Sequence, residues 1–158
     1  MKNLPAIVLL AVAVLAGCRA RPPSSSETRL AYWTKHNVTI GGRKDINPLK
    51  ATDENIEEGK ESFTSYCMVC HGLDGQNTGV PFAATVSPAV PSLASPQVQA
   101  YSDGQLKWII KNGIWPSGMP PSAGDFSDRE RWEMVLYIRH LPKVGSLGDP
   151  AVYSGRTK

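Results

Sequence analysis

Cysteine is scarce in this sequence, with three residues in 158, and long apolar runs are rare. The longest apolar run covers residues 4–15, which is shorter than the roughly 20 residues that a membrane-spanning helix requires. Glycine and proline are abundant instead, at 14 and 13 residues, which argues against a coiled coil, a helical repeat or a large parallel α/β enzyme. The cysteines carry the most information, because an odd number in a small chain leaves one residue to be explained.

Residues 1–17 have the pattern of a signal peptide, in which Lys2 precedes the apolar run and small residues precede Cys18. The segment Leu15–Cys18 resembles the lipobox of bacterial lipoproteins. That resemblance implies cleavage before Cys18 and attachment of a diacylglycerol to its thiol. We therefore expect an exported protein that is lipid-anchored on the periplasmic side of a bacterial membrane. The alternative is ordinary cleavage near Ala20, which leaves Cys18 without lipid.

Charge divides the rest of the chain into two parts. Residues 19–50 carry seven Lys or Arg against two acids, whereas residues 51–158 carry nine against twelve. A basic segment beside a lipid anchor can contact anionic headgroups, which contributes ~1 kcal/mol per charge at best. A solvated linker with incidental charge explains the same pattern equally well.

The basic part has no clear site. Residues 21–26 (Arg-Pro-Pro-Ser-Ser-Ser) predict a flexible, proline-stiffened spacer. Residues 30–41 show some apolar alternation, which indicates either a strand or a segment packed on the head, and His36 is a lone histidine typical of a polar surface. The chain is therefore predicted to consist of a signal peptide (residues 1–17), a lipid-anchored basic linker (18–51), a head domain (52–143) and a C-terminal tail (144–158).

Three helices are predicted in the head domain, each from a capping residue followed by helical apolar spacing. The third also has a capping box, formed by Ser127 and Glu130. The first helix is expected between Thr52 and Tyr66 and the second between Ser102 and Gly113. The third is expected between Ser127 and Pro142. The third helix is expected to bury one face, formed by Trp132, Val135, Leu136 and Arg139.

The segments between these helices, residues 72–101 and 113–126, are rich in glycine and proline and carry no strand signal. The fold class is therefore all-α, with three to four helices and long loops. Such loops have too small a core of their own to be ordered, so a large apolar group is expected at the centre.

Residues 67–71 (Cys-Met-Val-Cys-His) form a C-x-x-C-H motif, the attachment motif for c-type haem. The spacing suits thioether bonds from Cys67 and Cys70 to one porphyrin edge, and it places the His71 imidazole beneath the iron. Gly72 lets the chain leave without a side chain against the ring. The motif predicts one covalent haem c whose iron has His71 as an axial ligand.

Three other interpretations of the motif explain less. A structural zinc site needs about four ligands, and only two cysteines remain after export. A thioredoxin-type redox pair requires a βαβ setting, which the pattern lacks. A plain disulfide is common in exported proteins, yet it leaves His71 and the missing core unexplained.

The sixth iron ligand is predicted to be Met119, which lies 48 residues beyond His71 in a glycine–proline loop. Flanking prolines stiffen this loop, and loops usually carry polar side chains. Met68 lies within the attachment turn, and Met134 is more typical of helix packing. His140 and an open coordination position are the alternatives.

Residues 53–142 resemble a class I monohaem cytochrome c. The resemblance is carried by a Gly-x-x-x-Phe helix at Gly59, the C-x-x-C-H-G motif, a Gly-Met-Pro loop around Met119 and an aromatic-rich last helix. It implies that the first and last helices cross at Gly59. It also implies a hydrogen bond from the haem-ligating imidazole to a proline carbonyl, for which Pro81 is the match, with Pro88 and Pro91 competing.

A His/Met-ligated iron has no free position for a substrate, so the expected function is one-electron transfer by a carrier that is not itself an enzyme. Redox proteins are the expected partners, docking where Met68 and Val69 flank the haem edge, and no nucleic-acid partner is expected. A fixed subunit of a larger oxidoreductase complex is the first alternative. A haem enzyme or ligand binder with an open iron is the second.

Overall fold

The computed structural model describes residues 24–148 apart from 42, 87 and 116. The predicted signal peptide, Cys18 and residues 149–158 of the tail lie outside the described residues. Among those described, no strand is formed and a single isolated bridge joins Ile114 and Met119, which confirms the all-α fold class. The helices are α2 (Ser25–Thr34), the π-helix η1 (Lys35–Thr39), α3 (Asp53–Tyr66), α4 (Met68–His71), the 3-10 helix η2 (Pro81–Ala84), α5 (Pro96–Gln99), α6 (Asp103–Asn112) and α7 (Asp128–Arg139).

The three long helices of the head, α3, α6 and α7, begin and end where their signals predict. The Thr52, Ser102 and Ser127 side chains each accept a hydrogen bond from a backbone N–H of the first turn. At α6 and α7 the cap is completed by Gln105 and Glu130, whose side chains accept from the N-cap backbone. Local capping therefore defines the helix starts.

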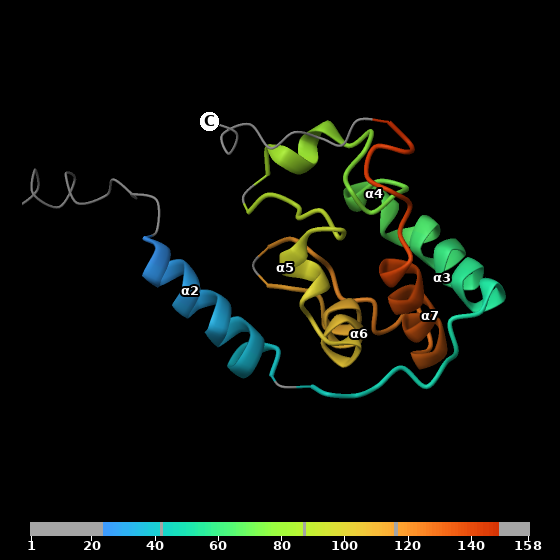
Figure 1. Ribbon diagram of the computed structural model, residues 1–158, viewed down its shortest axis with the longest axis horizontal. Coiled ribbons are helices and arrows are strands. Elements are labelled where there is room, and N and C mark those ends of the chain that lie inside the picture. Colours follow the sequence, from blue (N-terminus) through green and yellow to red (C-terminus); the bar gives the residue numbers. More distant parts are fainter. Residues whose placement is uncertain (1–23, 42, 87, 116, 149–158) are drawn as a thin grey trace, which may run out of the picture.

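The centre of the fold is the contact between α3 and α7, which lie side by side in Figure 1. A side chain at Gly59 would collide with the backbone carbonyl of Glu133, so the two helices approach as closely as backbones can. Next to this contact, the rings of Phe63 and Tyr137 lie 5.2 Å apart. The predicted close approach at Gly59 is thus confirmed.

Helix α7 is buried on every side rather than on one face, so the single-face prediction was too narrow. All residues from 131 to 138 are buried. The reason is that α5, α6 and the turn after the C-x-x-C-H motif pack on α7 in addition to α3. Tyr137 donates to the Leu73 carbonyl at 2.8 Å, and the Ile138 carbonyl accepts from Gln99 at 3.1 Å. The proline-rich stretch before α6 thereby packs on the last helix.

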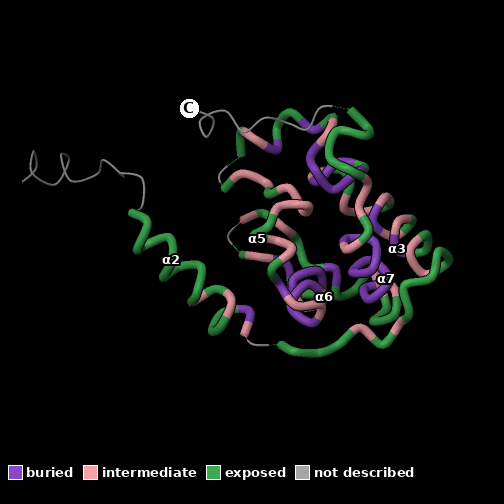
Figure 2. The backbone as a smooth tube through the Cα atoms, in the orientation of Figure 1, coloured by how far each residue is buried: buried purple, intermediate pink, exposed green. Residues whose placement is uncertain are grey.

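The N-terminal segment is helical, so the strand interpretation of residues 30–41 was wrong. Ser24 forms a capping box with Glu27, and α2 begins at once, which also corrects the flexible-spacer prediction for the serines. The alternative of packing on the head is confirmed at the end of the segment, where Ile40 is 2% exposed and Gln105 donates to the carbonyls of His36 and Gly41. Figure 2 shows α2 itself exposed along its length.

Within the described part of the chain, no helix combines the length and apolar character needed to cross a membrane.

Candidate functional site

The C-x-x-C-H motif lies at the junction of α3 and α4. Cys67 ends α3, with its N–H donating to the Phe63 carbonyl at 2.8 Å, and it also starts α4, where its carbonyl accepts from His71 N–H at 3.0 Å. One helical turn therefore holds both thiols and the imidazole. Cys67 and Cys70 are both free thiols, half-buried, so the disulfide alternative is not observed.

Burial controls the chemistry of the motif. Burial and the neighbouring Cys70 raise the pKa of the Cys67 thiol to about 12. Burial lowers the pKa of His71 to about 4, while the Pro91 carbonyl acts in the opposite direction by favouring the protonated ring. The Nδ1 atom of His71 is buried without a hydrogen bond of normal geometry. The imidazole is thus neutral at pH 7, the state in which a ring nitrogen can bind iron.

The proline carbonyl that acts on His71 belongs to Pro91, so the match to Pro81 was wrong. Pro81 is exposed and begins the 3-10 helix η2. The loop doubles back after η2, since Val90 N–H donates to the Ala83 carbonyl at 2.9 Å and Leu93 N–H donates to the Gly75 carbonyl at 2.7 Å. This return path, rather than the sequence distance from the motif, places Pro91 at the ring.

The turn after His71 forms a buried polar support that the sequence analysis missed. Gly72 has φ 71°, and a side chain there would lie 2.8 Å from the backbone of Thr78. Asn77 N–H donates to the His71 carbonyl at 2.7 Å, and the fully buried Asp74 carboxylate accepts from Thr78 Oγ1 at 2.6 Å. The available signal was Asp-Gly-Gln-Asn at residues 74–77, two residues beyond the motif, a typical turn composition.

Met119 is half-buried and packs against the same hydrophobic cluster as Cys67. Its carbonyl accepts from Ile114 N–H at 3.1 Å and passes so close to Gly113 that a side chain there would collide with it. Beyond Met119 the loop is held at Ser122, whose hydroxyl donates to the Ile110 carbonyl at 2.7 Å and whose carbonyl accepts from the buried Arg131 at 2.8 Å. Both ends of the Met119 loop are therefore fixed.

A direct bond joins this loop to the motif. The Tyr66 hydroxyl, one residue before Cys67, donates to the Pro121 carbonyl at 3.4 Å. The Tyr66 ring also meets Phe126 edge-on, with centroids 5.6 Å apart. The fold thus brings together two segments that the sequence analysis singled out separately.

The competing ligands are less well placed. His140 is exposed, and its Nδ1 atom lies 2.8 Å from the Leu136 carbonyl of its own helix. Met134 is fully buried in α7, as its packing role predicts. His36 lies in the N-terminal segment and not near the C-x-x-C-H motif. The described residues contain no group of three His, Cys, Asp or Glu side chains suited to a metal ion.

Comparison with known proteins identifies the domain. The family described as "cytochrome C oxidase, cbb3-type, subunit III" matches residues 54–138, which is more than half of the chain. The chain belongs to this family of c-type cytochromes. The match begins within α3 and ends within α7, so it spans the motif and the Met119 loop of the cytochrome domain.

Two similar proteins are longer than this chain. A thiosulfate dehydrogenase of Psychrobacter arcticus is 25% identical over 118 residues, covering 70% of this chain and 35% of the relative. A chain of the Kuenenia stuttgartiensis reducing HAO-like protein complex is similar in fold, with a TM-score of 0.51 and 24% identity over 59% of this chain and 46% of its own. This cytochrome therefore spans about a third of the curated relative and less than half of the solved chain.

The family places a c-type haem with iron in this domain, and the residues present fit that group. Two free thiols lie on one helical turn, and a buried, neutral imidazole lies beside them. A methionine packs on the same cluster. The cytochrome domain is accordingly that of an electron carrier or of an electron-transferring subunit of an oxidoreductase.

Proposed function

We propose that this chain is a one-electron carrier with a single haem c, held covalently by Cys67 and Cys70 and ligated by His71 and Met119. The observation that carries the proposal is the Tyr66–Pro121 hydrogen bond of 3.4 Å, which ties the attachment turn to the Met119 loop. We propose further that the chain is exported and anchored by lipid on Cys18, on the periplasmic side of a bacterial membrane.

The chain's residues suit electron transfer better than substrate chemistry. Haem supplies a one-electron Fe(III)/Fe(II) couple. A thioether ligand such as Met119 is a soft, weak donor, which favours the reduced state and raises the potential. The Asp74–Asn77 turn and the Pro91 carbonyl hold His71 from behind, so little rearrangement accompanies the change of charge. With both axial positions taken by side chains, no position remains for a substrate.

Electron exchange with a redox partner is proposed at the attachment turn. Met68 and Val69 are 43% and 65% exposed, although both are apolar and belong to the motif. Leu73, directly beyond the turn, is also exposed. A small apolar surface of this kind suits transient docking, because it releases water without requiring many paired charges.

A matched pair of variants tests the ligand assignment. Met119→Leu should leave the haem attached, abolish the absorption band of methionine-ligated ferric haem, lower the potential and admit carbon monoxide to the reduced protein. Met134→Leu makes the same chemical change at a fully buried packing position and should preserve all four properties. An unchanged spectrum in the Met119→Leu protein would show that Met119 is not the sixth iron ligand.

The lipid anchor is tested separately. Cys18→Ser should release the haem-containing protein from membranes washed at high salt, whereas the wild-type protein should stay in the membrane fraction. The mass of the purified wild-type chain reports haem and acyl groups together, so a mass with haem alone would contradict lipidation at Cys18.

The second candidate is a fixed subunit of a larger oxidoreductase complex, which the family description as a subunit favours. Native electrophoresis of detergent-solubilised membranes distinguishes the two. A haem-staining band at the mass of the single chain supports the carrier, whereas a single high-mass band that resists salt supports the subunit.

A further inference from the structure

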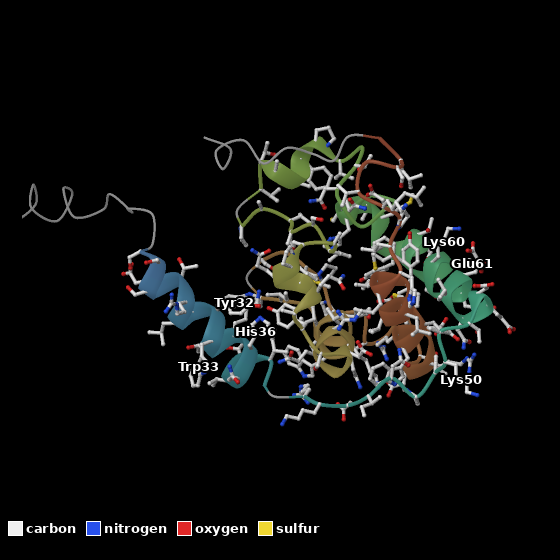
Figure 3. The ribbon with its side chains drawn as sticks, viewed as in Figure 1. Tyr32, Trp33, His36, Lys50, Lys60 and Glu61 are labelled. Atoms are coloured by element: carbon white, nitrogen blue, oxygen red, sulfur yellow. The ribbon has the colours of Figure 1, made fainter. Side chains whose placement is uncertain are left out.

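The N-terminal helix has two faces of opposite character. One face meets the head, where the His36 ring lies between Tyr32 and Tyr101, with centroid distances of 4.1 and 3.9 Å. The opposite face carries three large apolar side chains, Leu30, Trp33 and Val38, which are 65%, 57% and 65% exposed. Figure 3 shows Tyr32 and His36 on the side of α2 that faces the rest of the protein and Trp33 on the other side. We call Leu30, Trp33 and Val38 the outer strip.

The π-helix explains how these three residues share one face. Leu30 and Trp33 are three residues apart and are neighbours on a regular helix. In an uninterrupted α-helix the next position of this row would be the polar Asn37. The wide turn of η1 (Lys35–Thr39) adds one residue per turn, which brings Val38 into the row instead. The Asn37 amide is satisfied within the helix, since it donates to the Trp33 carbonyl at 2.9 Å.

The charges around the outer strip are mostly positive. Residues 19–50 carry seven Lys or Arg and two acids, and one of the acids, Glu27, is bonded within the capping box of α2. Arg29 precedes Trp33 by one helical turn and is exposed. Lys35 follows Trp33 by two residues and is exposed as well. Lys50, by contrast, lies far from α2 (Figure 3), and Arg43 is held over Trp108 of the head. An apolar strip with a cationic border is complementary to an anionic lipid surface, and each base near such a surface strengthens binding about fivefold.

The sequence also limits how far α2 can lie from a membrane. Six residue steps separate Cys18 from Ser24, and they span at most about 20 Å when fully extended. Building on the lipid anchor of the proposed function, we propose that the outer strip inserts into the interfacial region of an anionic bilayer. Helix α2 then lies on the membrane with the head attached through its opposite face, and Trp33 takes the interfacial position that tryptophan prefers.

Vesicle binding without the lipid tests this surface independently of the anchor. The haem-loaded chain from residue 18 onward, carrying Cys18→Ser, is sedimented with vesicles of phosphatidylglycerol and phosphatidylethanolamine or of phosphatidylcholine alone. We expect binding to the anionic vesicles that is at least tenfold stronger and that weakens as salt is raised. Equal binding to both vesicles, or none to either, would overturn the proposal. Because no lipid is attached in this protein, neither result bears on whether Cys18 is acylated.

Matched variants locate the contact. Replacing Leu30, Trp33 and Val38 together by serine should reduce the vesicle affinity at least tenfold and leave the haem spectrum unchanged, since all three are exposed. Trp115→Ser and Val144→Ser remove apolar side chains elsewhere that are even more exposed, and they should not change the affinity. Unchanged affinity in the triple variant would refute the strip as the lipid contact. So would concentration-dependent dimers in sedimentation velocity that the triple variant abolishes, because they would assign the strip to a second copy.

Discussion

The head domain and the N-terminal segment of residues 24–41 both form helices with capped N-termini. They differ in how extensively these helices are packed against the rest of the protein. In the head, α3 and α7 meet backbone to backbone at Gly59, and residues 131–138 of α7 are all buried. In the N-terminal segment, α2 has no buried residue, and the attachment depends on Ile40, the His36 ring stack and the two bonds from Gln105. The difference implies that the head unfolds as one unit, whereas the N-terminal segment can detach from it locally.

The largest effect is expected where the two head helices touch. Gly59→Ala would drive a methyl group into the Glu133 carbonyl and should lower the free energy of unfolding of the haem-loaded protein by about 3 kcal/mol. Gly124→Ala is the control, because a side chain there meets nothing and should change stability by less than about 0.5 kcal/mol. Guanidinium unfolding followed at the haem band measures both. Equal midpoints for the two variants would contradict the close approach.

A smaller and local effect is expected at the attachment of the N-terminal segment. Ile40→Ala removes its most buried side chain and should destabilise docking by about 2 kcal/mol, which is roughly thirtyfold faster amide exchange over residues 36–41. The unfolding midpoint of the head should not move. Val38→Ala, at an exposed position of the same segment, should change neither the amide exchange of residues 36–41 nor the unfolding midpoint of the head. A shifted head midpoint in Ile40→Ala would mean that the two regions unfold together.

Docking of the same segment should depend on pH. Burial and the adjacent Lys35 hold the pKa of His36 below its ordinary value of 6.5, and the pKa of the stacked Tyr101 is raised to about 12, so that ring stays neutral. A histidine with a lowered pKa in the docked state binds its proton better when released. Docking is therefore strongest above pH 6.5 and weakens as the pH falls below it. The protection factors for amide exchange over residues 36–41, which compare observed with intrinsic rates at the same pH, should fall on acidification in the wild type. They should not fall in His36→Phe, which keeps an aromatic ring without the titration.

The smallest effect is expected from the cation over Trp108. The Arg43 guanidinium lies 5.1 Å from the Trp108 ring centroid, and its Nε donates to the Ile40 carbonyl at 3.0 Å. Arg43→Gln should weaken docking by about 0.5–1 kcal/mol. Lys44→Gln, the same change of charge one residue later, should have less effect in the same exchange measurement. If Lys44→Gln weakened docking as much as Arg43→Gln, the effect would come from net charge and not from the contact with Trp108.

The sequence predicts the helices of the head well because each has its own start signal. Thr52, Ser102 and Ser127 all cap as their side chains suggest. Helix α2 has the same signal in Ser24 and Glu27, but two prolines and a run of serines before it favoured a spacer. The flexible-spacer prediction was wrong for the serines because the capping box of Ser24 and Glu27 was not recognised.

The site was predictable to the extent that its chemistry is local. The spacing of Cys67, Cys70 and His71 within one turn is a property of five consecutive residues, and Met119 is conspicuous in its loop; their ligand roles stay predictions. The carbonyl behind His71 was not predictable, because the choice of Pro91 depends on where the loop folds back, through bonds such as that from Leu93 N–H to the Gly75 carbonyl. The burial of α7 on all sides depends on the same loop.

The docking of Ile40 also sets how freely the head can search for a partner. For a chain anchored at Cys18, an undocked segment would leave 34 residue steps before Thr52, a reach of up to about 110 Å. With the segment docked, only the six residue steps from Cys18 to Ser24 separate the anchor from the docked part of the chain, a reach of at most about 20 Å. The volume available to the head shrinks about a hundredfold, and its effective concentration at a membrane-bound partner within reach rises by the same factor. The burial of one isoleucine side chain thereby shortens the tether between the anchor and the head. A short tether excludes distant partners and makes encounters with nearby partners more frequent.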